Sequence, residues 1–202
     1  MKRQHVPDML SSLSTEQRER LHAFADLVRS WSTRINLVAQ SDLDRLWERH
    51  VLDSAQLVDL LPPFATRLAD LGSGAGFPGL VLALLTDRDT HLVERDHRKA
   101  AFLREAARSL RASAIVHVAD AAALPPLGAD VVTARALAPL PQLLPLVVRH
   151  LRPGGVALLP KGRAAERELT EVAGSWTMRV ERFPSRTDPA ATILRLSEVA
   201  HV

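Results

Sequence analysis

Four closely spaced glycines in the first half of the chain indicate a ligand-binding turn. They follow an apolar run, Leu68–Leu71, and precede a helix-like stretch that opens at Pro78. Glycine permits positive φ angles and lets a ligand approach the backbone. A strand, a glycine turn and a helix in that order form the setting in which such turns bind nucleotides, so the segment predicts a Rossmann-like α/β layer. The glycines are Gly72, Gly74, Gly76 and Gly79.

The chain after Pro62-Pro63 alternates short apolar runs with helical stretches, which predicts a mostly parallel sheet with helices on both faces. Two final strands are separated only by a polar turn around Thr187-Asp188-Pro189, and this predicts an antiparallel C-terminal hairpin at the sheet edge. The fold class is therefore α/β with a seven-stranded sheet. The expected strands are Leu68–Leu71, Thr90–Val93, Ala114–Val118, Asp130–Thr133, Val156–Leu159, Trp176–Phe183 and Thr192–Leu196. The expected helices between them are Pro78–Leu85, Arg98–Leu110, Leu140–His150 and Ala164–Val172.

Residues 1–64 are predicted to form a helical N-terminal extension, followed by a Rossmann-like domain at 65–202. Ser14 and Gln17 have the spacing of a capping box, and apolar residues follow at the spacing of one buried helix face. A second helix is expected to start with Ser41 as its cap. The helical pattern then continues until the two prolines stop it.

Composition excludes several classes of protein. The chain has no Cys, so it can form neither disulfides nor thiolate metal sites, and no metal is expected. No stretch of about 20 residues runs without a charged side chain, so no membrane span is expected. The start, Met1-Lys2-Arg3, lacks the apolar block of a signal peptide, so the expected location is the cytoplasm. The net charge of +3 is too small to indicate RNA binding by itself.

The acids beside the glycine turn favour S-adenosylmethionine as the ligand. Asp70 precedes Gly72, and its negative charge suits a sulfonium and an ammonium group but would repel a pyrophosphate. Glu94 ends the next strand, where an acid accepts hydrogen bonds from ribose hydroxyls. The fragment Gly74–Gly79 also fits the G-x-G-x-x-G dinucleotide pattern, so a nicotinamide cofactor stays an alternative. The expected cofactor-binding residues here are Asp70, Gly72, Ser73, Gly74, Gly76 and Glu94.

Asp120, Ala121 and Ala122 follow the third expected strand, at the place where folds of this type hold adenine. Either the Asp120 carboxylate or a backbone N–H of the two alanines can meet the adenine edge. An ordinary loop acid without a ligand is the other interpretation.

Missing motifs narrow the possible chemistry. Methylation of a pyrimidine carbon usually needs a Cys nucleophile, and the chain has none. Exocyclic amines are commonly methylated with an Asn/Asp-Pro-Pro-aromatic loop after the fourth strand, where this chain has Thr133-Ala134-Arg135-Ala136. Guanine N7 carries an in-plane lone pair and no proton, so it needs no general base, only orientation and electrostatics. Arg135 stands where a cation can bind guanine O6 and N7 or a phosphate, or else pair with a nearby acid.

Several further segments together resemble one family. They are Trp31 with Asn36-Leu37, Arg49-His50-Val51-Leu52-Asp53-Ser54, the segment Asp70–Gly79, Lys99–Arg104, Ala134-Arg135-Ala136 and Pro160-Lys161-Gly162. From about Trp31 to Leu196 the chain resembles the bacterial small-subunit ribosomal RNA guanine-N7 methyltransferases, also called glucose-inhibited division protein B. The Arg-His-x-Leu-Asp-Ser segment is more specific than any glycine turn, because general methyltransferases lack it. The Glu at position 94 is a mild departure, since Asp is also common there in the family.

The resemblance implies a class I S-adenosylmethionine-dependent methyltransferase that acts, as a monomer, on 16S ribosomal RNA or the small subunit. It also implies cofactor contacts and a set of residues near the target. For His50 a hydrogen-bonded core position is the alternative, and for Arg49 with Asp53 a helix ion pair at i, i+4. The implied cofactor contacts are Gly72, Phe77, Ala121, Ala122 and Arg135; the implied catalytic residues are Asn36, His50 and Arg135; the implied RNA contacts are Arg49, Lys161 and Arg163.

Three other functions remain open at the level of sequence. A methyltransferase of the same fold can act on a small molecule or a protein. A non-catalytic RNA-binding module can retain the fold without binding the cofactor. A nicotinamide-dependent oxidoreductase would use the glycine turn for a dinucleotide.

Overall fold

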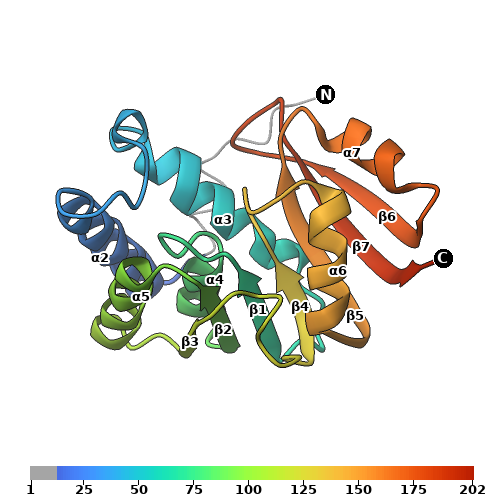
Figure 1. The fold of residues 1–202 in the computed structure, drawn as a ribbon. Helices are drawn as coiled ribbons and strands as arrows, with labels where there is room; N and C mark the ends of the chain where they lie inside the picture. Colours follow the sequence, from blue (N-terminus) through green and yellow to red (C-terminus); the bar gives the residue numbers. More distant parts are fainter. Residues whose placement is uncertain (1–12) are drawn as a thin grey trace.

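The computed structural model describes residues 13–202 and contains one seven-stranded sheet with the order β3-β2-β1-β4-β5-β7-β6 (Figure 1). Residues 1–12, which include the Met1-Lys2-Arg3 start, lie outside the described part. The first five strands are parallel and β7 is antiparallel to both its neighbours. The strands are β1 (Arg67–Leu71), β2 (Asp89–Glu94), β3 (Ala114–Val118), β4 (Ala129–Thr133), β5 (Leu151–Lys161), β6 (Trp176–Pro184) and β7 (Thr192–His201).

The predicted seven-stranded α/β fold is therefore confirmed, including the C-terminal hairpin. The last strand extends to His201, beyond the predicted end at Leu196. Dinucleotide-binding sheets have the parallel order 3-2-1-4-5-6, whereas here the antiparallel β7 lies between β5 and β6. That arrangement argues against the nicotinamide alternative.

Helices cover both faces of the sheet, as the alternating pattern predicted. Leu68, Val131 and Leu158 belong to one face, under α4 and the 3₁₀-helix η3 (Gln56–Leu60), and α5 and α2 extend this layer beside β2 and β3. On the opposite face Ala69 and Val132 pack under α6 and α7. The helices are α2 (Thr15–Ser32), α4 (Gly79–Thr86), α5 (His97–Ser109), α6 (Leu140–His150) and α7 (Ala165–Val172).

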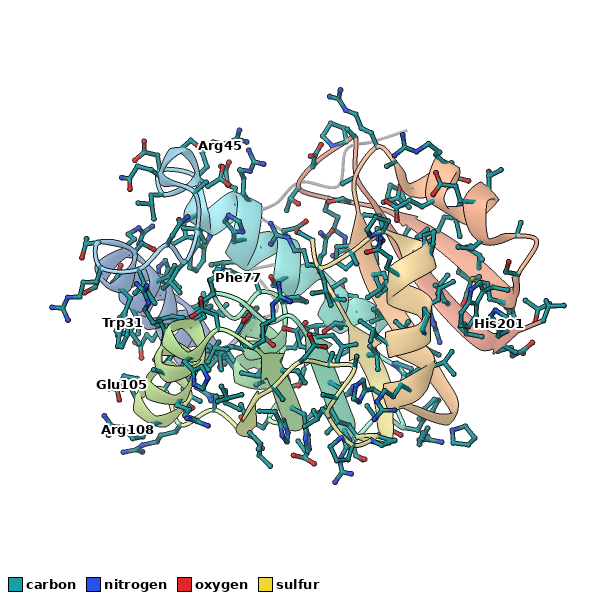
Figure 2. All side chains as sticks on the ribbon, in the orientation of Figure 1. Trp31, Arg45, Phe77, Glu105, Arg108 and His201 are labelled. Carbon is teal, nitrogen blue, oxygen red and sulfur yellow. The ribbon has the colours of Figure 1, made fainter. Side chains whose placement is uncertain are left out.

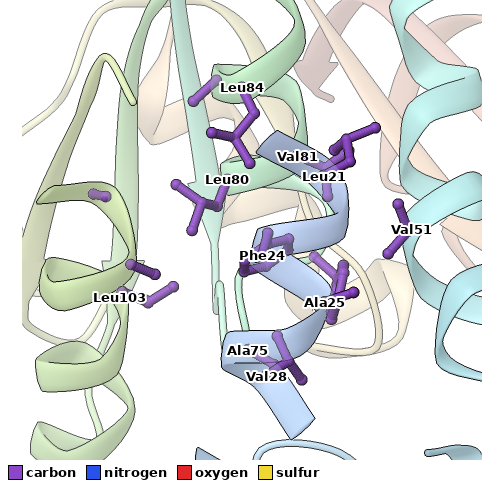
Figure 3. Close-up of a cluster of buried hydrophobic side chains, with 14 of the residues drawn as sticks. Leu21, Phe24, Ala25, Val28, Val51, Ala75, Leu80, Val81, Leu84 and Leu103 are labelled. Carbon is purple, nitrogen blue, oxygen red and sulfur yellow. The ribbon is translucent and has the colours of Figure 1, made fainter. Parts of the chain in front are cut away.

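The first described helix, α2, begins with the predicted capping box. The Ser14 hydroxyl accepts the Gln17 N–H, and the Gln17 side chain accepts the Ser14 N–H. Its apolar face packs on α4 and α5, with Phe24 fully buried (Figure 3). Because α2 shares one hydrophobic cluster with α4 and α5, it is anchored to the sheet layer. The division at residue 64 into an extension and a domain stays a prediction.

The segment between α2 and β1 is helical but is not the single capped helix that the sequence suggested. Ser41 does not cap it: Ser41 lies inside the short turn η1 (Gln40–Asp42), which has no side-chain cap. The chain then passes through a π-helix, η2 (Trp47–Leu52), one turn of α-helix, α3 (Asp53–Ala55), and a 3₁₀-helix, η3 (Gln56–Leu60). Burial of Leu46, Val51 and Leu57 determines this winding, and the π-helix carries Arg49 and His50. Such π turns are frequently found at functional sites.

Within residues 13–202, no helix is long and apolar enough to cross a membrane.

Candidate functional site

The glycine turn leaves the carboxyl end of β1 and enters α4. Gly72, Gly74 and Gly76 have positive φ angles of 71°, 54° and 91°, a region that side chains with a Cβ rarely adopt. The N–H groups of Gly72 and Ser73 donate to the Val93 carbonyl of β2 at 2.9 and 3.0 Å. The turn is therefore attached to the neighbouring strand at the sheet edge where ligands bind in such folds.

Asp70 lies beneath this turn rather than in an open cavity. Its side chain is only 1% exposed, and its oxygens accept hydrogen bonds from the Thr133 hydroxyl at 2.7 Å and the Gly79 N–H at 3.2 Å. Burial raises the pKa of Asp70 to about 6, against the opposing effect of these hydrogen bonds. The direct contact with a cofactor cation expected from sequence does not fit this geometry, because both oxygens face the turn and β4. Asp70 instead shapes the turn.

Exchanging Asp70 for Asn should change how stability depends on pH. Because its folded-state pKa is raised from 3.8 to about 6, the carboxyl favours the folded state below about pH 4 and this contribution is lost as pH rises through about 6. The wild type should lose roughly 3 kcal/mol relative to Asp70→Asn between about pH 4 and pH 7. Urea unfolding of both proteins across this range measures the difference. A gap that stays constant with pH would contradict the prediction.

A cavity of about 380 Å³ opens above the glycine turn, and we call it the glycine-loop cavity. Glu94 lies on its wall and is 8% exposed. One of its carboxylate oxygens accepts the Gly74 N–H and the other accepts the Asp96 N–H, both at 2.8 Å. Each oxygen keeps a second lone pair for a hydroxyl. The wall includes Gly72, Gly74, Glu94, Lys99, Asp120, Ala121 and Leu137.

The predicted adenine segment forms the far side of the glycine-loop cavity. Asp120 and Ala121 line it, but the Asp120 carboxylate already accepts the Ala122 N–H at 2.8 Å, so that N–H is not free for a ligand. The carbonyl of Ala121 is bonded to the buried side chain of His150 at 2.8 Å. His150, at the end of α6, thereby holds this loop in place.

A second cavity, of about 660 Å³, lies on the other side of the segment that links β4 to α6, and we call it the arginine cavity. Ala136, Leu137 and Ala138 line both cavities. Leu137 packs closely on Gly72: a Cβ added at Gly72 would lie 2.7 Å from Leu137 Cδ1. One thin wall therefore separates the two spaces. Arg45, Arg49, Asp53, Arg135, Lys161 and Thr187 are among the residues of the arginine cavity.

Arg135 joins two predicted motifs that lie 85 positions apart in sequence. Its Nη2 donates to the Arg49 carbonyl at 3.0 Å and lies 2.9 Å from His50 Nδ1, and its Nη1 is 3.5 Å from Asp53 Oδ2. Burial, and then the charge of Arg135, lowers the pKa of His50 to about 4. The imidazole is therefore neutral near pH 7, and its Nδ1 accepts the arginine N–H. The alternative of an Arg49–Asp53 ion pair is wrong, because Arg49 pairs with Asp42 at 3.4 Å. His50 does hold a hydrogen-bonded position, although it is partly and not fully buried.

Three other expected site residues lie elsewhere than the sequence suggested. Lys161 is not on an open rim: its side chain is 10% exposed, and its ammonium donates to the Ala138 carbonyl and to Glu168, at 2.9 and 2.8 Å. Asn36 is exposed and lines a separate hollow beside Lys99, away from Arg135. The Phe77 ring, labelled in Figure 2, is buried and contacts the rings of Phe24 and His50, so its backbone is the part available to a ligand.

The remaining expected residues are placed as follows. Ser73 is buried, and its hydroxyl donates to the Asp70 carbonyl at 2.9 Å. A Cβ at Gly76 would lie 3.1 Å from Phe24, so Gly76 serves packing inside the turn. Arg163 is exposed and forms no ion pair within residues 13–202, which leaves it free to meet a phosphate.

Sequence reasoning missed the residues that organise Arg135 from a distance. Asp42 pairs with Arg49 and lies 3.6 Å from His50 Nε2. Thr187 donates to Asp53 at 2.8 Å across 134 positions of sequence. No local pattern signals such contacts, although the turn around Thr187 was itself expected.

Comparison with known proteins gives a consistent assignment. A family model described as GidB, rRNA small subunit methyltransferase G, matches residues 17–190. Ribosomal RNA small subunit methyltransferase G of Rhodospirillum centenum is 60% identical over 190 residues, which cover 93% of this chain and 87% of that protein. The protein of the same name from Granulibacter bethesdensis is 50% identical, over 95% of this chain and 90% of that one.

Solved structures share the fold at low sequence identity. A putative O-methyltransferase from Klebsiella pneumoniae superposes with a TM-score of 0.59 at 17% identity, covering 88% of this chain and 89% of that chain. TYW2 from M. jannaschii, in complex with AdoMet, gives a TM-score of 0.59 at 14% identity, covering 84% and 80%.

Proposed function

The chain belongs to the GidB family of rRNA small subunit methyltransferases G, and on this premise we propose that it methylates N7 of a guanine in 16S ribosomal RNA with S-adenosylmethionine as donor. Family membership supports the transfer of a methyl group to small-subunit RNA. The choice of N7 is supported by the chemistry of the site, which has neither a Cys nucleophile nor an Asn/Asp-Pro-Pro loop.

The glycine-loop cavity suits S-adenosylmethionine. Its volume of about 380 Å³ lies within the usual range for small-ligand sites. Glu94 retains lone pairs for ribose hydroxyls, and Asp120 and Ala121 stand where the adenine would lie. The wall combines two acids, Glu94 and Asp120, and two bases, Arg95 and Lys99, with apolar residues such as Leu137, and a mostly apolar lining with a few placed polar groups is usual for small-ligand sites. S-adenosylmethionine supplies an electrophilic methyl group when bound.

The single observation that carries the proposal is the wall shared by the two cavities. Ala136–Ala138 borders the cofactor site on one side and the larger cavity with Arg135 on the other. Arg135 precedes this wall directly, so its guanidinium can orient a purine beside the methyl donor. Lys161, bonded to the Ala138 carbonyl, fixes the wall and acts as a positioning residue.

No proton has to be removed from guanine N7, so the site needs alignment more than a general base. Neutral His50 accepts the Arg135 N–H and thereby orients the guanidinium. The target base must leave its stack to enter the cavity. Arg49, which lines the arginine cavity, and Arg163, which is exposed just after Gly162 of that cavity, are suited to the RNA backbone. We place this reaction in the cytoplasm, where a single copy of the chain acts on the small subunit or its RNA.

Mapping N7-methylguanosine in 16S ribosomal RNA tests the proposal. Cells that contain the protein should show one N7-methylguanine that disappears when its gene is deleted and returns on complementation. Purified protein should then transfer tritium from labelled S-adenosylmethionine to small subunits of the deletion strain. An unchanged methylation map would refute the proposed function, and transfer only to a protein or a small molecule would support the rival methyltransferase.

A further inference from the structure

We propose that Asp53 recognises the N1–H of the target guanine and that Thr187 positions the Asp53 carboxylate for this contact. The inference rests on the function proposed above and deepens it, because it assigns the base specificity to a residue pair outside the glycine turn. It starts from an incomplete set of hydrogen bonds in the wall of the arginine cavity.

The two oxygens of Asp53 have different surroundings. Oδ1 accepts hydrogen bonds from Thr187 Oγ1 and from Gln56 Nε2, both at 2.8 Å. Oδ2 accepts none within the described part of the chain, and its nearest recorded partner is Arg135 Nη1 at 3.5 Å. Arg135 Nη1 is likewise without a hydrogen-bond partner there. A carboxylate oxygen and a guanidinium nitrogen thus lie side by side in the wall of the cavity, each short of a hydrogen bond, with the nitrogen itself buried in that wall.

The β6–β7 turn holds this carboxylate rigidly. Gln56 is 3% exposed; its Oε1 accepts the Arg186 N–H at 2.9 Å and its Nε2 donates to Ser185 Oγ at 3.2 Å. The turn that carries Thr187 is therefore docked onto η3, and Thr187 fixes the rotation of the Asp53 side chain. A carboxylate oriented in advance loses little entropy when it accepts a bond from a ligand.

The order of donor and acceptor distinguishes the purines. Around the guanine ring the reactive N7 is followed by O6, an acceptor, and then by N1–H, a donor. When O6 faces Arg135 and N1–H faces Asp53, N7 lies on the Arg135 side, next to the wall shared with the glycine-loop cavity. Adenine presents an amino group, a donor, in place of O6 and an unprotonated N1, an acceptor, in place of N1–H. For its donor to face Asp53 and its acceptor to face Arg135, adenine would have to turn over, and its N7 would then lie on the Asp53 side. A site that is built to bond N–H rejects analogues that lack it.

Modified target nucleosides test which edge is read. Small-subunit RNA made by splinted ligation can carry guanosine, inosine or 1-methylguanosine at the mapped position, with tritium transfer as the readout. Inosine retains N1–H and O6 and should react within about threefold of guanosine. 1-Methylguanosine lacks N1–H and should react at least about 100-fold more slowly, since a charged acceptor would be left unpaired.

Asp53→Asn provides the matched variant. It keeps the shape of the side chain, should lower kcat/KM for guanosine about 10- to 100-fold, and should shrink the penalty for 1-methylguanosine to less than about tenfold. Asp59→Asn is the control, because Asp59 pairs with Arg186 of the same turn at 2.8 Å but lies outside the arginine cavity. It should leave both kcat/KM for guanosine and the penalty for 1-methylguanosine at their wild-type values. Thr187→Val should reproduce part of the Asp53→Asn effect on kcat, and Thr187→Ser, which keeps the hydroxyl, should retain the wild-type kcat.

Calorimetry with S-adenosylmethionine and thermal unfolding should give wild-type values for all these variants. If Asp53→Asn retains the full 1-methylguanosine penalty, or if wild type accepts 1-methylguanosine as well as guanosine, the inference is wrong while the proposed methylation stands. If wild type transfers no methyl group to any of these RNAs, the proposed function itself fails.

Discussion

Replacing Arg135 with alanine should lower the turnover of methyl transfer by about 10²–10³-fold, the usual cost of removing one aligned charged donor from an active site. The guanidinium contacts the Arg49 carbonyl, His50 and Asp53 at once, and no other side chain of the described residues joins these groups. Its loss removes both the orientation of the base and the counter-charge of Asp53. Single-turnover tritium transfer to small subunits measures the effect.

A surface arginine provides the control for Arg135→Ala. Arg108 lies on the exposed side of α5 and, within residues 13–202, pairs only with Glu105 (Figure 2), so Arg108→Ala should keep wild-type turnover. Thermal unfolding of Arg135→Ala should remain a single cooperative transition. Arg135→Lys keeps the charge but loses the planar guanidinium with its several fixed N–H donors, so we expect it to be little more active than Arg135→Ala. Turnover of Arg135→Ala near the wild-type rate would remove this residue from the site.

Exchanging Gly79 for alanine should destabilise the protein and abolish cofactor binding. A Cβ at this position would lie 2.5 Å from Asp70 Cβ and 2.5 Å from Leu92 Cδ2, closer than real Cβ contacts allow. Alanine gains up to about 1 kcal/mol of helix propensity over glycine, but overpacking a dense core typically costs about 1–3 kcal/mol. The clash should prevail, because β1 and the first turn of α4 must move apart. Urea unfolding and calorimetry with S-adenosylmethionine measure the two losses.

The matched variant for Gly79→Ala is Gly174→Ala. A Cβ at Gly174 meets no atom within 4 Å, and the residue is not among the glycines with positive φ. Its exchange should be neutral or stabilising by up to about 1 kcal/mol, since alanine restricts the unfolded chain. If Gly79→Ala binds the cofactor and unfolds like Gly174→Ala, close packing of the turn on Asp70 is not essential.

The regular elements and the glycine turn followed from local sequence. Residues 114–118 and 140–150 form the strand and the helix with the predicted ends, because apolar spacing and flanking turn residues act over a few positions. The capping box at Ser14 is of the same kind. Ser41 was misassigned as a cap because burial of Leu46 and Val51 outweighs the preference of a single exposed serine.

Which side chains are free to act depended on contacts between residues distant in sequence. Asp70 looked like a ligand for a cation, yet Gly79 and Thr133 occupy its oxygens. Lys161 looked like an RNA contact, yet Glu168 neutralises it. A motif specifies the type of residue at a position, whereas burial and partners decide its charge and its availability.

From the sequence alone came the sheet with its helices, the cofactor turn and the family resemblance, all of which depend on short-range patterns or on motif identity. The tertiary structure alone decided that Arg135, His50 and Asp53 meet, that one wall divides two cavities, and that Thr187 orients Asp53 from 134 positions away. The physical reason is that hydrogen bonds and ion pairs act over a few ångströms in space, and chain folding, not sequence spacing, sets those distances.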